Sequence, residues 1–449
     1  MGVRNQSAVE MSEMNAQAIG IDIGTTTISG VVYDLEHQCV VVSKTISNES
    51  FMPTENSWER IQNPAWIIEK AKGLLDELLE RCPQVTSIGL TGQMHGILYL
   101  DQMGNCLSPL YIWQDGRGNL KVGEETYAQR AVRITGSHAA TGYGLITHFY
   151  NLEHGLVPED AKHICTIGDY LGMVLTGREE PRMHSSNAAS LGFFEADKGQ
   201  FAVQSLQRLG IDADLLSPVT ENFEKIGSYR GIPVTVAIGD NQASFIGTAG
   251  LHVEAGTVLV NMGTGGQISV LSDVCFEGEG IEARPLMKGN YLLVGASLCG
   301  GRAYAILEKF FRTFAGYLNE NAGLQYDVME KMAQKAMKEN LEMQVNTTFQ
   351  GTRQNPQQRG SILEISENNF TPEGLTFGVL KGMAQELFHL FLNIQAGTGI
   401  QVRKLIASGN GLRQNPVLQE IFSELFKTEL CMAKCEEEAA CGAAISSAD

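Results

Sequence analysis

The sequence lacks any apolar run near 18 residues, so it predicts neither a transmembrane helix nor a membrane partner. It also lacks positive charge, because 33 Lys and Arg stand against 51 Asp and Glu and give a net charge of −18. This balance argues against nucleic acid as a partner, since a phosphate backbone requires a basic face. ATP remains compatible, because a nucleotide needs only local backbone donors and a bound cation.

A disulfide framework and a signal peptide are also missing. The nine cysteines follow no regular spacing, which indicates reduced thiols in a cytoplasmic protein. Only Cys431, Cys435 and Cys441 are close in sequence; they match no metal-ligand pattern, and their role is left open. Residues 1–16 have no apolar centre and are expected to form a flexible leader.

The length of 449 residues and the 49 glycines favour two large α/β domains. Residues 18–34 read as strand, Gly/Thr turn and strand, and residues 257–270 repeat that pattern about half a chain later. Two similar hairpins suggest a duplicated architecture. We expect domains at 17–245 and 246–449, with helices over 64–81 and about 373–396.

Asp22 ends an apolar strand, where an ionised carboxylate is costly unless it is paired, and a hydrated Mg²⁺ would pair it. After Gly24, the residues Thr25, Thr26 and Thr27 offer amide and hydroxyl donors to phosphate oxygens. The alternative is an ordinary glycine turn with strand-favouring threonines. The segment is not a Walker A loop, which would carry GK[ST] and continue into a helix.

The second hairpin carries Gly263-Thr264-Gly265-Gly266 at its turn, and the same phosphate-binding logic applies there. Gly409-Asn410-Gly411 and Asn415 lie where a strand ends and a helix begins, a common place for the adenosine part of a nucleotide. Most glycine turns that occur singly have only a structural role. The prediction of phosphate binding is therefore strengthened because two such hairpins occur in the same chain.

Asp240 and Asn241 end another buried-type strand and open a helix rich in small residues. Phosphoryl transfer needs positioning, charge neutralisation and a group that accepts the hydroxyl proton, and Asp240 is suited to that last task. The alternative is an aspartate that caps the following helix.

Two further segments suit a polyol ligand. Gln93, Met94 and His95 lie between two glycines after a strand, and Trp113 and Asp115 belong to the segment WQDGR. Such side chains supply donors and acceptors for hydroxyl groups and a flat apolar face for sugar C–H groups. For His95 the alternative is a structural histidine.

Taken together, the motifs resemble the FGGY carbohydrate kinase family over roughly residues 17–447. The resemblance is carried, in family order, by IGIDIGTTT, LTGQMHG, WQDGR, AIGDNQASFIGT, VNMGTGG, GGRA, FQGTR and ASGNGLRQN. Within that family the chain is most similar to sedoheptulokinases, and xylulokinases are next. It departs from many members at Thr147–Tyr150, which leaves the sugar identity open.

The resemblance implies a two-domain, actin-like (ribonuclease H-like) α/β fold with a ligand cleft between the domains. The residue roles known for that family imply that Asp22 lies near Mg²⁺ and that Thr25–Thr27 and Thr264 lie near the phosphates. They also imply that Gly301, Gly411 and Asn415 lie near the nucleotide. Met94, His95 and Asn241 contact the sugar, and Asp240 is the catalytic base.

The predicted activity is therefore transfer of the γ-phosphoryl group of MgATP to a terminal hydroxyl of a ketose, with sedoheptulose 7-phosphate as the favoured product. Xylulose or another ketose or polyol is the alternative substrate. A non-catalytic sugar or nucleotide sensor and an actin-like or chaperone-like ATPase are the rival classes. Sequence alone leaves the oligomeric state open, a homodimer included.

Overall fold

The computed structural model describes residues 16–352, 355 and 357–449, and within them the chain forms two compact units. Unit 1 contains the described residues up to Leu251 together with Pro285–Lys288 and Cys435–Asp449. Unit 2 contains His252–Arg284 and Gly289–Lys434. The predicted leader, apart from Ala16, lies outside the described residues, as does Arg353 of the FQGTR segment.

Unit 1 is built on a mixed sheet. Its two outer pairs, β15–β16 and β2–β3, are antiparallel, as is β1–β2, whereas β1, β16 and β17 all run parallel to β5. The strand order is β15 (Lys225–Tyr229), β16 (Ile232–Thr235), β5 (Val85–Gly92), β1 (Gln17–Ile23), β2 (Thr27–Asp34) and β3 (Cys39–Ser47), with β17 (Ile238–Gly239) also paired to β5.

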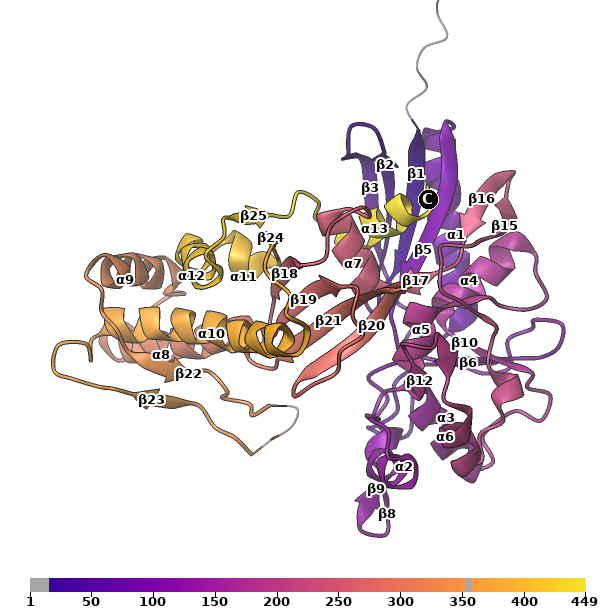
Figure 1. Cartoon of the computed structure of the whole chain (residues 1–449), viewed down its shortest axis with the longest axis horizontal. Helices are drawn as coiled ribbons and strands as arrows, with labels where there is room; N and C mark the ends of the chain where they lie inside the picture. The colour runs from indigo at the N-terminus through magenta and orange to yellow at the C-terminus, as the bar shows by residue number, and fades with distance from the viewer. Residues whose placement is uncertain (1–15, 353–354, 356) are drawn as a thin grey trace, which may run out of the picture. The chain divides into compact units, whose positions relative to one another are not determined.

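The helices of unit 1 are α1 (Pro64–Arg81), α2 (Tyr127–Thr135), α3 (Gly144–Glu153), α4 (Ile167–Thr176), α5 (Ser185–Leu191), α6 (Val203–Arg208), α7 (Asp240–Ala249) and α13 (Glu438–Ser446). Short strand pairs are β4 (Ile61–Gln62) with β7 (Leu110–Tyr111), β6 (Leu98–Leu100) with β10 (His163–Cys165), β8 (Lys121–Val122) with β9 (Glu125–Thr126), β11 (Met183–His184) with β14 (Val219–Thr220), and β12 (Phe194–Glu195) with β13 (Gln200–Phe201). In Figure 1, α1, α4 and α13 lie beside this sheet, whereas α2, α3, α6, β8 and β9 lie beyond its lower end.

Helices α1 and α13 cover opposite faces of the sheet. Helix α1 packs its leucines on β2, where a Cβ at Gly30 would lie 2.6 Å from a methyl carbon of Leu78. Helix α13 lies directly on β1 and β5, because a Cβ at Gly20 would collide with the carbonyl oxygen of Ala440. Gly30 pairs with Ile21, so these two residues point to the same face of the sheet. Gly20, the neighbour of Ile21, points to the opposite face, because successive strand residues alternate.

Unit 2 repeats the hairpin arrangement. The antiparallel pair β18–β19 lies beside β24, which is parallel to β18, as β1–β2 lies beside β5 in unit 1. The sheet order is β20 (Ile281–Met287), β21 (Asn290–Ser297), β19 (Gly266–Ser272), β18 (Thr257–Met262), β24 (Lys404–Ser408) and β25 (Leu430–Met432). The other elements are α8 (Gly300–Leu318), α9 (Tyr326–Lys338), β22 (Gln344–Asn346), β23 (Ser361–Leu363), α10 (Pro372–Thr398), α11 (Asn410–Arg413) and α12 (Pro416–Phe426).

The end of the chain packs within unit 1. Residues Cys435–Asp449 group with unit 1, whereas the sequence interpretation assigned all of 246–449 to a second domain. The physical reason is a close helix contact, in which a Cβ at Gly247 of α7 would collide with the carbonyl oxygen of Glu438. A contact between segments almost 200 residues apart leaves no local signal in the sequence.

The three neighbouring cysteines separate in the same way. Cys431 is exposed on β25 of unit 2, whereas Cys435 and Cys441 are buried in a small apolar cluster of unit 1 with Ala18 and Tyr33. None of the nine cysteines, all of which lie in the described residues, forms a disulfide. Within the described part of the chain, no helix has the length and apolarity needed to cross a membrane.

Candidate functional site

Three parallel strands of unit 1 end at one edge of the sheet. In the register of these strands Asp22 of β1 is beside Thr91 of β5, and Gly239 of β17 is beside Gly92. The residues that follow β5 and β17 therefore emerge beside Asp22. We call Asp22, Gln93–His95, Asp240 and Asn241 the strand-end site. The sequence had predicted each of these residues as a site residue, and the parallel register accounts for their proximity.

The ionised form of the Asp22 carboxyl group is disfavoured by its surroundings. Burial, and then the negative charges of Asp240 and Glu437, raise its pKa from 3.8 to about 7. Its Oδ1 atom has no hydrogen-bond partner among the described residues, and the same is true of Oδ1 of Asn241. Asp240 is the first residue of α7, where the helix dipole favours a negative charge. The arrangement gathers acceptor oxygens with too few protein donors to satisfy them.

A divalent cation fits this set of oxygens. Mg²⁺ prefers carboxylate and carbonyl oxygens, keeps several of its waters, and is commonly held through one or two carboxylates plus substrate phosphates. Among the residues that the structure describes, no group of three His, Cys, Asp or Glu side chains forms a complete protein cage. Asp22 is therefore suited to a cation whose remaining ligands are water and phosphate.

The loop after β5 presents Met94 and His95. The sulfur of Met94 would lie 2.8 Å from a Cβ at Gly239, so the loop packs directly against the residue that precedes Asp240. His95 has a positive φ of 71°. Its backbone N–H donates to Oγ of Ser190 at 3.0 Å, its Nδ1 is 2.6 Å from the Ser190 carbonyl oxygen, and its ring stacks on Tyr143. The imidazole is thus fixed from two sides.

Trp113 and Thr25, which the sequence assigned to sugar and phosphate respectively, contact each other. The indole N–H of Trp113 donates to Oγ1 of Thr25 at 3.0 Å, although the side chain remains 47% exposed. Gln62 links this contact to the loop after β5. Its amide donates to the Thr25 carbonyl at 2.8 Å and its oxygen accepts from Gln93 at 2.8 Å. Thr26 and Thr27 are exposed at the turn.

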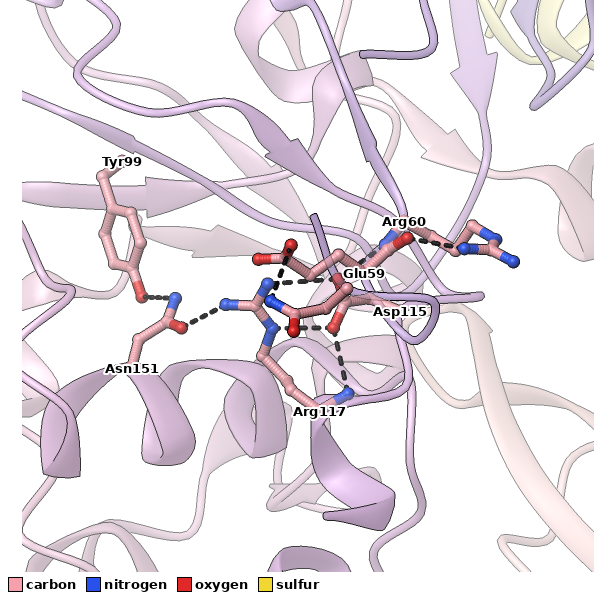
Figure 2. Close-up of polar contacts among 7 residues, drawn as sticks. Glu59, Arg60, Tyr99, Asp115, Arg117 and Asn151 are labelled. Atoms are coloured by element: carbon pink, nitrogen blue, oxygen red, sulfur yellow. Dashed lines mark hydrogen bonds and ion pairs between the residues drawn. The ribbon is translucent and has the colours of Figure 1, made fainter. Parts of the chain in front are cut away.

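Asp115, which the sequence assigned to sugar binding, makes its contacts within the protein. The side chain is fully buried, and Figure 2 shows it paired with Arg117. One of its oxygens accepts from Nε of Arg117 at 2.7 Å, and the other accepts from Nη2 at 3.1 Å and from the backbone N–H of Arg60 at 2.9 Å. Arg117 also donates to Asn151, which donates to the hydroxyl of Tyr99. Both carboxylate oxygens thus accept hydrogen bonds from the protein itself, which favours a structural role for Asp115, and its role in sugar binding stays a prediction.

Helix α5 contributes residues that the sequence interpretation missed. Oγ of Ser186 accepts from the backbone N–H of Gly239 at 2.9 Å, and the amide of Asn187 donates to the Ala237 carbonyl at 3.0 Å. Ser190 of the same helix fixes His95. One buried helix therefore orients both the strand that precedes Asp240 and the loop that carries His95. Its sequence, SSNAASL, has no apolar periodicity and offered no signal.

Unit 2 contains a second group of predicted residues. We call Gly263–Gly266, Gly301 and Gly409–Gly411 the glycine-turn site. The backbone N–H of Gly301 donates to the Gly263 carbonyl at 2.9 Å, and that of Arg302 donates to the Thr264 carbonyl at 3.0 Å. Helix α8 therefore begins directly on the turn, and the Thr264 side chain stays exposed.

Gly409 and Gly411 lie against the end of β18. Gly409 has a φ of +85°, and a Cβ there would lie 2.6 Å from the Met262 carbonyl oxygen; at Gly411 the corresponding distance is 2.8 Å. A side chain at either position would displace the strand that leads into the turn. Asn415 caps α12, because its Oδ1 accepts from the backbone N–H of Leu418 at 3.0 Å. The amide nitrogen of Asn415 carries two donors that suit a nucleotide contact.

Comparison with known proteins places both units in one family. Residues 17–247 match the N-terminal domain of the FGGY family of carbohydrate kinases, and residues 258–448 match its C-terminal domain. The chain is similar to sedoheptulokinase from Mus musculus, with 27% identity over 95% of this chain and 96% of the relative. It is also similar to xylulose kinase from Lactococcus lactis subsp. lactis (strain IL1403), with 24% identity over 96% of this chain and 87% of the relative.

Solved structures agree on the fold. Xylulose kinase from Rhodospirillum rubrum superposes with a TM-score of 0.81 at 21% identity, covering 96% of this chain and 89% of that one. Plasmodium falciparum glycerol kinase with ADP superposes with a TM-score of 0.79 at 18% identity, with the same coverage of both chains. The expected two-domain, actin-like α/β fold is thus confirmed. The chain belongs to the FGGY family of carbohydrate kinases.

Proposed function

We propose that this sugar kinase transfers the γ-phosphoryl group of MgATP to a terminal hydroxyl of a ketose, with sedoheptulose as the first substrate to test. The observation that supports this proposal most strongly is the proximity of Asp22 and Asp240 at the ends of β1 and β17, the strands on either side of β5. Burial, and then the charge of Asp240, raise the pKa of Asp22. Full-length similarity to sedoheptulokinases supports the choice of sugar.

Asp240 accepts the proton of the attacking hydroxyl in this proposal. The residue begins α7, and the Ser186 and Asn187 contacts hold the strand before it. A base held in this way raises the nucleophilicity of the hydroxyl oxygen as the new O–P bond forms. Met94 and His95 orient the sugar, and Asn241 contributes its unpaired side-chain oxygen to a sugar hydroxyl.

The phosphates are assigned to the turns. Exposed Thr264, the Gly263–Gly266 backbone and Thr25–Thr27 offer hydroxyl and amide donors to phosphate oxygens. Gly301, Gly409, Gly411 and the amide nitrogen of Asn415 are assigned to the remainder of the nucleotide. Mg²⁺ bound through Asp22 would offset negative charge on the transferring group.

The test is an ADP-release assay with a panel of sedoheptulose, xylulose, ribulose, fructose, gluconate and glycerol. We expect sugar-dependent ADP formation, with the highest kcat/KM for sedoheptulose. Xylulose is the main alternative, since xylulose kinases are also among the relatives. A single discriminating contact is worth only ~1–3 kcal/mol, so the ranking must be measured as kcat/KM and not as activity at one concentration.

The catalytic assignment is tested separately with Asp240→Asn. We expect the rate to fall about 10²–10⁴-fold, because a positioned base is lost while the residue keeps its size. Asp197→Asn is the matched control, since Asp197 is an exposed aspartate of the same unit. A variant with a tenth of the wild-type rate would remove Asp240 from the role of base. ADP formation that is independent of every sugar would indicate an ATPase instead.

A further inference from the structure

A polar hollow lies in unit 2 beside helix α10. Its volume of about 560 Å³ is within the range of small-molecule sites. Its walls are β22 with the residues on either side of that strand, one face of α10, and the side chains of Gln358 and Glu364. Figure 1 shows β22 beside α10, and the two are in direct contact, because a Cβ at Gly382 would lie 2.0 Å from the carbonyl oxygen of Val345. The hollow therefore lies between elements that pack on each other.

The hollow is separate from both groups of residues that we assign to the substrates. Its described lining residues come from 342–348, 358, 364 and 381–389, and none of them belongs to the glycine-turn site. The strand-end site lies in the other unit of the chain. The phosphoryl-transfer reaction proposed above therefore gives this hollow no role.

Thr348 brings an unused hydroxyl group to the hollow. The residue is 8% exposed, and its Oγ1 atom has no hydrogen-bond partner among the described residues. A buried hydroxyl group without a partner is unfavourable, and such groups are rare in folded proteins. The neighbouring Thr347, in contrast, donates to Oε2 of Glu386 at 3.1 Å. The unpaired hydroxyl group of Thr348 thus indicates a bound molecule that completes its hydrogen bonding.

Glu386 is the second group with unused hydrogen-bonding capacity. Burial raises the pKa of its carboxyl group, although hydrogen bonds from Ser297 and Thr347 act in the opposite direction. Both of these donors are neutral hydroxyl groups, and a carboxylate can accept about four hydrogen bonds. A further donor from a bound molecule would therefore stabilise the charged form of Glu386.

The charge of the lining disfavours anions. Glu342, Glu364 and Glu386 line the hollow, and Lys381 is the only Lys or Arg among the described lining residues. Lys381 is already paired with Glu342 at 3.3 Å. A phosphorylated sugar or a nucleotide would therefore be repelled. A metal ion also fits poorly, because the described residues contain no group of three His, Cys, Asp or Glu side chains that could hold one.

We propose that this hollow is a second small-molecule site, which binds an uncharged polyol, that is, an unphosphorylated sugar or sugar alcohol. Hydroxyl groups both donate and accept hydrogen bonds. They match a lining in which carboxylates accept, whereas Thr348 and the amides of Gln344 and Gln385 do both. An organic ammonium ion is a poorer match, because it only donates and leaves the amide and hydroxyl donors without acceptors. The site is independent of which sugar is phosphorylated at the strand-end site.

The test follows the methionine methyl groups of the full-length protein by NMR while sorbitol is added. Met343 lines the hollow, whereas Met94 belongs to the strand-end site, so their resonances report the two places separately. Met343→Leu and Met94→Leu identify the two resonances. We expect the Met343 resonance to shift with a saturating dependence on sorbitol concentration, and the Met94 resonance not to follow the same curve.

Three variants test the lining. Thr348→Val keeps the shape of the side chain and should weaken the sorbitol affinity reported by Met343 about tenfold, the equivalent of one lost hydrogen bond. Glu386→Gln keeps the size of the side chain and should also weaken that affinity, which provides a result even if Thr348→Val does not fold. Thr376→Val is the matched control, since Thr376 is a buried threonine of the same unit that does not line the hollow. Its sorbitol affinity should equal that of the wild type.

Four results would each overturn the proposal. A Met343 shift that is linear in sorbitol concentration would be an effect of the solvent and not of a site. Saturation with spermidine but not with sorbitol would show that the hollow takes organic cations. Met343 and Met94 curves that coincide would mean that sorbitol binds at the strand-end site. An affinity unchanged by both Thr348→Val and Glu386→Gln would place the sorbitol outside the hollow.

Discussion

Replacing Asp115 by alanine removes the ion-pair partner of the fully buried guanidinium group of Arg117. Arg117 is 1% exposed and has three aromatic rings around its guanidinium carbon, with the Tyr111 centroid at 4.3 Å and those of Trp58 and Tyr150 at 5.6 and 5.5 Å. These rings offer attraction but no counter-charge. Without Asp115, the positive charge keeps only neutral acceptors, namely the side-chain oxygen of Asn151 and the hydroxyl of Tyr111.

The size of the effect follows from that burial. Removing one partner of a buried ion pair typically costs about 3–5 kcal/mol, since the remaining charge stays out of water without compensation. For a unit of this size, that corresponds to a fall in Tm on the order of 10 °C. The double variant Asp115→Leu, Arg117→Met should recover part of the loss, because it removes both charges, although the Arg60 N–H and Asn151 are left without partners.

The assay is thermal unfolding followed by calorimetry, with sugar and ATP KM values measured at a temperature where every variant is folded. An exposed pair provides the control, because Arg133 holds Glu125 with the same forked geometry at 2.9 and 2.6 Å. Glu125→Ala should change Tm little, as exposed ion pairs contribute little to stability. If Asp115→Asn leaves Tm unchanged and raises only the sugar KM, Asp115 is a substrate ligand and the structural assignment is wrong.

Three further predictions address single residues. His95→Ala should raise the sugar KM about tenfold while the ATP KM is unchanged, because one sugar hydrogen bond is lost; a rise in the ATP KM alone would contradict the assignment. Gly409→Ala should cost about 1–3 kcal/mol and weaken ATP binding, since its φ of +85° and the Met262 carbonyl leave no room for Cβ, and unchanged Tm and ATP KM would refute this. Burial lowers the pKa of His148 and His184 from 6.5 to about 4, so NMR should show neutral imidazoles at pH 5. Because the folded-state pKa values lie below 6.5, the stability that these two groups contribute is complete above pH 6.5 and is lost as the pH falls towards 4; titration near pH 6.5 would contradict this.

The strand-end site could be predicted because its signals are local. Asp22 and Asp240 each interrupt an apolar strand pattern, and carboxylates at the ends of parallel strands meet at one edge of a sheet. The loop of His95 was recognisable from its glycines and polar residues. The family motifs then linked these segments in the correct order.

Two assignments could not be made from the sequence. The sequence shows that Asp115 is polar and lies near Trp113, but it does not show that the turn directs the carboxylate onto Arg117, two residues later. The role of α5 was missed for a different reason. A helix that is buried except at Ala189, and that buries serine and asparagine, has no apolar stripe. Its partners, Gly239 and His95, lie about 50 and 95 residues away.

Helix α13 has a consequence for how the protein acquires its structure during synthesis. This helix covers β1 and β5, the central strands of unit 1, yet it leaves the ribosome after the whole of unit 2. Figure 1 shows the last coloured helix of the chain lying against the first strand. Until then, the sheet face at Gly20 and Gly89 has no cover from this helix, and exposed apolar strands are prone to aggregate. The residues of unit 2 emerge together, interrupted only by Pro285–Lys288, whereas unit 1 must wait for its last segment. Deletion of Cys435–Asp449 should therefore impair the folding of unit 1, the unit that was translated first.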